Sequence, residues 1–167
     1  IYQNWLTWWV GINVVRSKSG FFSKNYNLNY DDLKSIKQVP KLNKISIIYS
    51  TKNFSAGHSK RINFLNKLIK SDISCYIDVY GDGFTPIPDK WDAIVGYKYH
   101  LVIENEIQTD YWSEKLADAF LGFSYPIYYG CPNITKYFDE SSMSIIDISN
   151  FDVIKEKIKE IIESNIF

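Results

Sequence analysis

Short apolar runs rich in β-branched residues alternate along this chain with longer segments in which apolar side chains recur every three or four positions. The short runs have the length and composition of strands, and Gly, Pro, Asn and Asp residues bound them. The alternation becomes regular from Lys44 onward. It predicts strands at residues 45–50, 73–80, 97–103, 127–129 and 144–146.

The longer segments have the spacing of amphipathic helices, as Ile154, Ile158 and Ile162 show in the last of them. The pattern predicts helices at residues 59–70, 110–120, 134–138 and 151–164. Strands that alternate with helices favour a parallel sheet with helices on both faces. The expected fold is therefore α/β, a Rossmann-like three-layer sandwich, in which ligands bind at the carboxyl ends of the strands.

Residues that favour helix ends mark two of these helices. His58 or Ser59 is expected to cap the first helix. Thr109 or Asp110 is expected to cap the second, and Gly122 is expected to end it.

Residues 1–42 lack this regularity, because Asn, Ser, Lys and Gly interrupt their apolar runs. We expect residues 1–43 to form an interdomain connection or accessory segment, and residues 44–167 to form one domain. The apolar stretch in the opening residues is too short and too polar to span a membrane, and it has no basic leader. Because the chain does not begin with Met, we expect it to be a piece of a longer protein.

The charge balance narrows the classes of partner. Lys+Arg and Asp+Glu both number 19, so the formal net charge is +0. Bulk charge would therefore attract neither nucleic acid nor an anionic membrane, and any phosphate group must be bound locally. Aromatic residues make up 17% of the chain, and many are Tyr, whose ring and hydroxyl suit a sugar-handling protein as well as a core.

Several familiar motifs are missing. The chain has no GxxxxGK[ST] loop, no GxGxxG after its first strand, and no DxD pair of the kind that many metal-dependent sugar transferases use. Cys75 and Cys131 show no CxxC or Cys/His spacing, which argues against a metal site. We expect both to be buried free thiols, with a disulfide left open. His58 and His100 are the only histidines, and neither fits a Ser/His/Asp order.

One group of candidate ligand-binding residues surrounds the start of the second helix. A helix N-terminus attracts phosphate, and Lys115 adds a full positive charge there. Glu114 can accept two hydrogen bonds from a ribose diol. Glu104 and Asn105 end the preceding strand, and Tyr111 can bond to phosphate or cover a ring. The alternatives are a solvated Glu–Lys pair and an aromatic ring packed on the helix.

A second cation follows the first strand. After a polar loop that contains Gly57, Arg61 is expected in the first turn of a helix, where it can grip a diphosphate with two hydrogen bonds. Lys60 and His58 compete for this role. The alternative is a basic turn on the surface.

Three motifs stand out together. They are Ile103-Glu104-Asn105-Glu106, Tyr111-Trp112-Ser113-Glu114-Lys115 and Pro126-Ile127-Tyr128-Tyr129-Gly130. In combination they resemble the donor-binding half of the α-1,3/4-fucosyltransferases, glycosyltransferase family 10, in its bacterial form. The likeness extends more weakly over residues 44–162. The main departures are the bulky Trp112 in place of Val, and Glu106 in place of Ser.

The resemblance implies the C-terminal half of a GT-B fold. It also implies an inverting enzyme that transfers L-fucose from GDP-β-L-fucose to a glycan hydroxyl in an α-1,3 linkage, with no tightly bound cofactor and no metal requirement. By position, Arg61 and Lys115 would hold the diphosphate. Glu114 would hold the ribose, and Tyr111 would line the donor pocket.

The same resemblance places Glu104 and Asn105 at the fucose side of the pocket, and the backbone of Val79-Tyr80-Gly81 near the guanine. It places the general base in the acceptor-binding N-terminal half, which we expect this chain to lack. The chain is therefore expected to hold no catalytic residue of its own, and to bind GDP or GDP-fucose without transferring fucose.

Two other functions stay open. The chain is either a non-catalytic nucleotide-binding or interaction module of the same fold, or part of a transferase for another nucleotide sugar. The expected partners are GDP-fucose and a glycan acceptor but no nucleic acid, with a homodimer and contact with a membrane surface left open. Asn53 and Asn133 begin Asn-x-Ser/Thr triplets, which an Asn-rich chain acquires by chance. The expected location is the cytoplasm or membrane periphery of a bacterium, or the Golgi lumen of a eukaryote.

Overall fold

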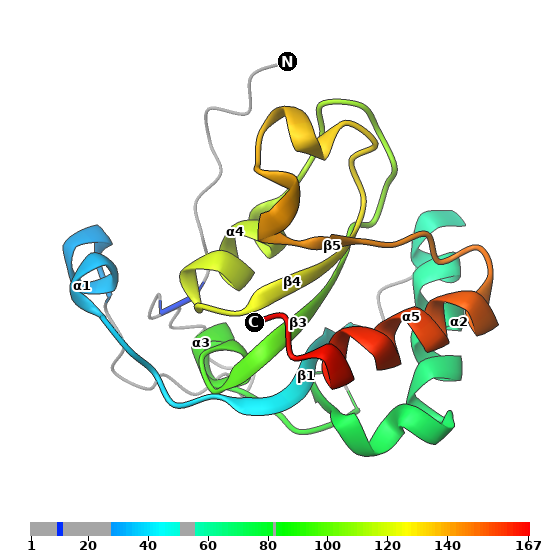
Figure 1. Ribbon diagram of the computed structural model, residues 1–167, viewed down its shortest axis with the longest axis horizontal. Helices are drawn as coiled ribbons and strands as arrows, with labels where there is room; N and C mark the ends of the chain where they lie inside the picture. Colours follow the sequence, from blue (N-terminus) through cyan, green and yellow to red (C-terminus); the bar gives the residue numbers. More distant parts are fainter. Residues whose placement is uncertain (1–9, 12–27, 51–55, 82) are drawn as a thin grey trace, which may run out of the picture.

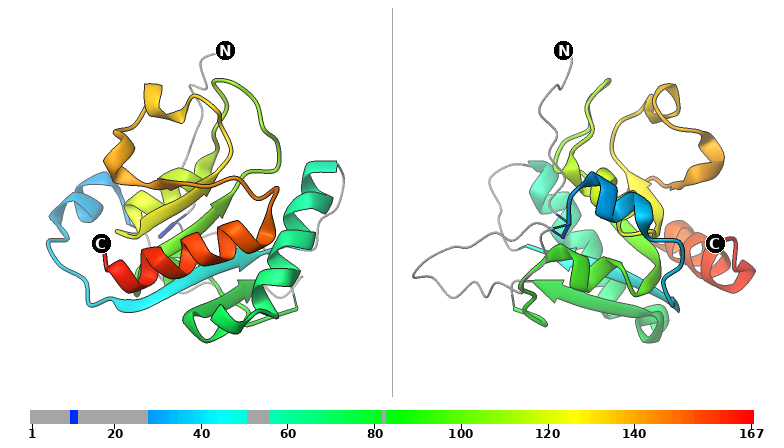
Figure 2. Two further views of the ribbon diagram at one scale, coloured as in Figure 1. Left: turned by 45° about the vertical axis from the view of Figure 1, so that its right-hand side comes forward. Right: turned by 90° about the vertical axis from the view of Figure 1, so that its left-hand side faces the viewer.

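The computed structural model describes residues 10–11, 28–50, 56–81 and 83–167. In these ranges the chain forms a sheet with helices on both faces (Figures 1 and 2). The strands are β1 (Leu42–Tyr49), β2 (Ile77–Gly81), β3 (Tyr97–Ile103), β4 (Tyr125–Tyr129) and β5 (Ser144–Ile145). The helices are α1 (Tyr30–Ser35), α2 (Ala56–Ile69), α3 (Lys90–Ile94), α4 (Glu114–Leu121) and α5 (Phe151–Ser164). Short 3₁₀ helices are η1 (Asp72–Tyr76), η2 (Ile134–Lys136) and η3 (Glu140–Ser142).

All neighbouring strands of this sheet run parallel, and their order is β2-β1-β3-β4-β5. The chain leaves β1 on one side to form β2, and then crosses to the other side of β1 to form β3. The crevice outside the carboxyl ends of β1 and β3 is therefore the topological switch point, where sheets of this type bind ligands. The predicted parallel α/β sandwich is confirmed.

The main core lies between one face of the sheet and the helices α2 and α5, which lie beside one another (Figure 1). Because side chains alternate along a strand, Ile47 and Leu101 point to this face. They belong to the same buried cluster as Leu65 and Leu68 of α2 and Ile158 of α5. The apolar faces predicted for these two helices are thus the buried ones.

The opposite face carries α4 and the short helix α3. Val102 and Tyr128 point to this face and pack with Leu116 and Ala119 of α4. In the described part of the crossover from β2 to β3, the only helix is α3, which has five residues. A helix this short leaves the sheet thinly covered beside α4, and a cavity opens there.

The first described residues pack on this same face. Val10 is buried with Leu33 and Trp91, and its backbone N–H donates to the Asp118 carboxylate at 3.0 Å. The remainder of residues 1–27 lies outside the described residues, as do residues 51–55 and the triplet at Asn53. Since β1 begins at Leu42, the strand starts slightly before the domain boundary expected after residue 43, and that boundary stays a prediction.

Several predicted element bounds were wrong. The segment 73–80 is half strand, because pairing with β1 begins only at Ile77, and the residues before it form η1. Helix α2 begins at Ala56, so His58 and Ser59 lie inside it and Arg61 falls in its second turn. The helices α1 and α3 were not predicted, because segments of five or six residues are too short to show a helical period.

The predicted cap of α4 was also wrong. Ser113 is the N-cap, and its side chain accepts from the Lys115 backbone N–H. Asp110 cannot serve, because its carboxylate accepts hydrogen bonds from the Asn133 amide at 2.7 Å and the Tyr137 hydroxyl at 2.6 Å. Gly122 does end the helix, as expected.

Candidate nucleotide-binding site

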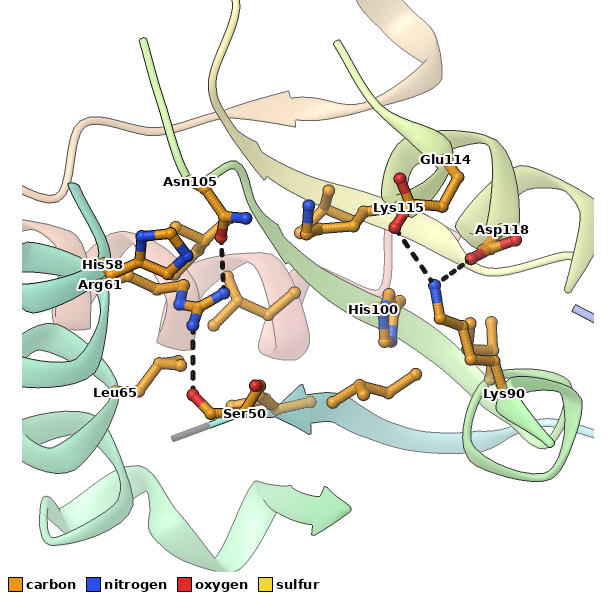
Figure 3. A pocket seen from close by; sticks show the side chains of 16 residues that line it. Ser50, His58, Arg61, Leu65, Lys90, His100, Asn105, Glu114, Lys115 and Asp118 are labelled. Carbon is orange, nitrogen blue, oxygen red and sulfur yellow. Dashed lines mark hydrogen bonds and ion pairs between the residues drawn. The ribbon is translucent and has the colours of Figure 1, made fainter. Parts of the chain in front are cut away.

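A cavity of about 330 Å³ lies at the switch point, between the carboxyl ends of β1 and β3 and the first turn of α4 (Figure 3). Four residues predicted from the sequence line it: Arg61, Asn105, Glu114 and Lys115. They come from α2, the end of β3 and the start of α4, so residues up to 54 positions apart in the chain converge on one space. Glu104 and Tyr111, which the sequence also predicted, are not part of the lining.

Arg61 bridges the ends of two strands. Its Nη1 donates to the Asn105 side-chain oxygen at 2.7 Å, and its Nη2 donates to the Ser50 backbone carbonyl at 3.1 Å. The side chain is mostly buried, and burial lowers the pKa of its guanidinium, although Arg stays charged at any physiological pH. Its Nε has no hydrogen-bond partner among the described residues. A guanidinium that is mostly buried and keeps one N–H without a hydrogen-bond partner is well suited to bind an anionic ligand.

Glu104 supports the site from beneath. It is only 2% exposed, and its carboxylate accepts from the Ser113 N–H at 2.8 Å and the Ser113 hydroxyl at 2.6 Å. It also accepts from the Lys115 ammonium at 3.2 Å. A carboxylate at a helix N-terminus stabilises the positive end of the helix dipole. Glu104 thus fixes the start of α4 and holds Lys115 at the edge of the cavity.

Glu114 has a partner that was not predicted. The Lys90 ammonium, from the start of α3, lies 3.6 Å from a Glu114 carboxylate oxygen and 2.6 Å from an Asp118 carboxylate oxygen. Lys90 and Asp118 also line the cavity, and Figure 3 shows these three side chains at the end away from Arg61. Two signals in the sequence mark this group: Asp118 follows Glu114 by one helical turn, and Asp89 is a typical helix cap directly before Lys90.

His100 lies in the middle of the cavity wall, between these two groups (Figure 3). Its Nδ1 lies 2.7 Å from the Ser46 hydroxyl, and the residue is buried. Burial, together with the nearby charge of Lys90, lowers the pKa of His100 to about 3. The imidazole is therefore neutral at physiological pH. The available signal in the sequence was a histidine in the interior of a predicted strand, directly before the apolar run Leu101-Val102-Ile103.

Tyr111 lies in the loop that leads into α4. Burial and the nearby charge of Glu104 raise the pKa of its phenol. The loop is fixed by a pair of hydrogen bonds, since the Asp110 N–H donates to Asn133 at 2.9 Å and the Asn133 amide donates back to Asp110 at 2.7 Å. Among the competing cations, His58 lines the cavity, whereas Lys60 donates to the Tyr129 hydroxyl at 2.8 Å.

The predicted guanine-side segment lies at the end of β2. Gly81 has a φ of 102°, and a Cβ there would lie 2.2 Å from the Tyr49 carbonyl oxygen, so only glycine fits. Val79, Tyr80 and Gly81 are outside the lining of the cavity. Their role near a guanine ring stays a prediction.

Other site types find little support in the described part of the chain. No group of three or more His, Cys, Asp or Glu side chains there can hold a metal ion. Cys131 is buried and free as predicted, but Cys75 is exposed, because η1 carries it to the surface. None of the helices in the described ranges is long and apolar enough to cross a membrane.

Comparison with known proteins supports the sequence motifs. A family model described as glycosyltransferase family 10 (fucosyltransferase) C-term matches residues 40–164. An alpha-(1,3)-fucosyltransferase FucT of Helicobacter pylori is 34% identical over 74 residues, which is 44% of this chain and 16% of that protein. A 4-galactosyl-N-acetylglucosaminide 3-alpha-L-fucosyltransferase 9 of Bos taurus is 29% identical over 136 residues, which is 77% of this chain and 36% of that protein.

The fold matches as well. A crystal structure of an alpha1,3-fucosyltransferase with GDP-fucose superposes with a TM-score of 0.59 at 25% identity, covering 74% of this chain and 36% of that one. A crystal structure of an alpha1,3-fucosyltransferase with GDP gives the same TM-score and identity, and covers 81% of this chain and 38% of that one. The matched parts of this chain thus cover between 16% and 38% of the length of these relatives. Its α/β fold is the C-terminal half of a GT-B glycosyltransferase. The chain belongs to glycosyltransferase family 10, the fucosyltransferases, and contains the C-terminal domain of that family.

Proposed function

We propose that this chain is the donor-binding domain of an inverting fucosyltransferase, and that its cavity binds GDP-β-L-fucose. The observation that carries the proposal is the convergence of Arg61, Glu114 and Lys115 on one cavity at the switch point of the sheet. Arg61 of α2 and Lys115 in the first turn of α4 line the same cavity, and two cations from different elements are suited to bind a diphosphate. A carboxylate stands beside them, where a ribose diol can bond to it.

Each side chain has a role in this proposal. Arg61 and Lys115 hold the diphosphate from opposite sides, and Glu114 accepts hydrogen bonds from the two ribose hydroxyls. Asn105 keeps Arg61 in place and borders the fucose side. Glu104 contributes indirectly, because its carboxylate oxygens already accept hydrogen bonds from Ser113 and Lys115. Tyr111, in the loop that leads into α4, lines the donor pocket in this proposal.

The whole reaction needs more than these residues. Inverting transfer of fucose to an acceptor hydroxyl requires a base within hydrogen-bond reach of that hydroxyl. We assign the base to the acceptor-binding half of the enzyme, so that this chain alone binds the donor without turnover. In this proposal the acceptor is a glycan, as in the name of the Bos taurus relative, and the linkage is α-1,3, as in the names of the other related enzymes. A bacterial cytoplasmic or membrane-peripheral location, a homodimer and independence of metal ions remain predictions.

Calorimetric titration of this chain with GDP, with UDP as the control nucleotide, tests the proposal. GDP is expected to bind and UDP is not. Arg61→Ala and Lys115→Ala should each weaken GDP binding by about 1.5–3 kcal/mol, the range for hydrogen bonds to charged groups. Lys60→Ala, a neighbouring cation outside the cavity lining, is the matched control. Unchanged GDP affinity in both Arg61→Ala and Lys115→Ala would remove the phosphate assignment. Equal binding of UDP would favour a transferase for another nucleotide sugar. No binding of either would favour the non-catalytic interaction module, or a site that forms only together with the acceptor-binding half.

A further inference from the structure

Two carboxylates and one ammonium form a compact group at the end of the cavity opposite Arg61 (Figure 3). Glu114 and Asp118 lie one turn apart on α4, so their side chains point the same way and repel each other. The Lys90 ammonium lies between them, 2.6 Å from Asp118 and 3.6 Å from Glu114. Only Lys90 comes from another element, α3, and it therefore ties the start of that helix to α4.

In this group the Asp118 carboxylate is fixed in position, whereas the Glu114 carboxylate can change its position. Asp118 is 1% exposed, and its second carboxylate oxygen accepts from the Val10 N–H at 3.0 Å, so it cannot move without breaking a buried contact. The Lys90–Asp118 distance is that of a strong charge-assisted hydrogen bond. The Glu114 side chain is 28% exposed, and its longer contact with Lys90 leaves its oxygens able to accept further hydrogen bonds.

We propose that Lys90 is a positioning residue that holds the Glu114 carboxylate over the cavity for the ribose diol, with Asp118 as its buried anchor. This inference rests on the proposed function, because it concerns the residue that would bind the ribose. Glu114 is the first residue of its helix, where a glutamate side chain has several accessible rotamers. Without Lys90 it would also be drawn toward solvent by repulsion from Asp118. Ordering that side chain in advance lowers the entropy cost of binding the diol.

The test compares two nucleotides that differ only in the groups Glu114 would contact. GDP and 2′,3′-dideoxy-GDP are titrated calorimetrically against this chain and its Lys90→Met variant. In the unmodified chain, GDP is expected to bind at least about tenfold more tightly than the dideoxy nucleotide, because it alone offers the diol. In Lys90→Met, GDP affinity is expected to fall at least about fivefold while dideoxy-GDP affinity is unchanged. The ratio of the GDP affinity to the dideoxy-GDP affinity therefore falls toward one.

Three further variants control for stability and charge. Lys90→Met leaves Asp118 buried without its cation, which can unfold the chain. The double variant Lys90→Met with Asp118→Asn removes that unpaired charge, keeps an acceptor for the Val10 N–H, and should show the same collapsed ratio. Lys90→Arg keeps the charge and should restore the ratio in part. Lys44→Met breaks a comparable surface pair with Asp78, 2.9 Å apart, and should leave both affinities unchanged.

The outcomes separate this inference from the proposed function. If the unmodified chain binds both nucleotides equally, Glu114 does not hold the ribose. The proposed roles of Glu114 and of Lys90 would then both be wrong. If the unmodified chain discriminates and Lys90→Met discriminates equally well, the role of Glu114 stands and that of Lys90 is wrong. An equal loss of affinity for both nucleotides would also overturn the inference, since it would show that Lys90 acts on the phosphates or on the fold.

Discussion

Replacing Glu104 by Gln isolates the charge of a carboxylate that the fold has placed beneath the donor site. The two side chains have nearly the same shape, so the change creates no cavity. In the native protein one Glu104 oxygen accepts from the Ser113 N–H, and the other accepts from the Ser113 hydroxyl and the Lys115 ammonium. The glutamine oxygen can keep the first of these bonds. Its NH₂ group faces the other two donors.

The cost follows from what is lost at that second position. The Ser113 hydroxyl already accepts from the Lys115 ammonium at 3.1 Å and from the Lys115 backbone N–H, so it can accept from the amide only by giving up one of those bonds. The Lys115 ammonium cannot accept, and it loses a charge-assisted bond and meets a donor instead. Breaking a fully buried pair costs about 3–5 kcal/mol. Because Lys115 is 26% exposed and water can solvate it, we expect about 2–3 kcal/mol for Glu104→Gln. For a chain of this size that corresponds to a fall in Tm of about 4–12 °C.

Urea unfolding followed by circular dichroism measures this loss, with thermal melting as a second reading. Glu106→Gln is the matched control, because it makes the same chemical change at an exposed position two residues away. The control should stay within about 0.5 kcal/mol of the unmodified chain. If Glu104→Gln were equally mild, the buried carboxylate would not be what fixes the start of α4, and the account of Lys115 given above would be wrong.

Three further predictions concern stability. Because the pKa of His100 is about 3 when folded and 6.5 ordinarily, the unfolded chain binds more protons between these values, and the stability that His100 contributes above pH 6.5 is lost as pH falls toward 3. Urea unfolding from pH 7 down to pH 4 should show this loss, and His100→Asn should flatten it. Gly81→Ala should cost about 3 kcal/mol or more, because its Cβ would meet a carbonyl oxygen of β1. Gly83→Ala, where φ is 80° but nothing lies within 4 Å, should cost only about 1–2 kcal/mol by the same measurement. Asn133→Ala and Thr135→Ala both remove the Asn-x-Thr triplet, but only Asn133→Ala breaks the paired bonds to the loop before α4 and should lower the stability in thermal melts, by about 1–3 kcal/mol.

The start of α4 shows why a helix cap is hard to predict from the sequence, since several neighbouring residues can serve as the cap. Thr109, Asp110 and Ser113 are all residue types that cap helices, and the sequence predicted Thr109 or Asp110. The structure uses Ser113, since Asp110 is drawn into hydrogen bonds with Asn133 and Tyr137, more than twenty residues later. The same loop conformation gives Asp110 a φ of 60°. Such a choice depends on a partner that no local pattern can identify.

The residues of the candidate site likewise include some that the sequence predicted correctly and some whose positions depend on the tertiary structure. Arg61, Asn105, Glu114 and Lys115 were predicted because they follow strands or begin helices, and the carboxyl ends of parallel strands meet at one edge of a sheet. The family resemblance implied that Glu104 borders the fucose side together with Asn105, and that role stays a prediction. Successive residues at a strand end point in opposite directions, however, and the Glu104 side chain is buried under α4 while Asn105 faces the cavity.

The sequence by itself determined the succession of the strands and of the longer helices α2, α4 and α5 along the chain, the apolar faces of α2 and α5, and the family motifs around α4. These depend on periodicity and on residues that are close together in the chain. Only the tertiary structure decided that Lys90 joins Glu114 and Asp118, that His100 lies in the cavity wall, and that Glu104 supports the site from below. Those contacts depend on the register of parallel strands and on a short crossover that leaves one face of the sheet open. Both are set by packing between distant segments, which hydrophobic periodicity does not encode.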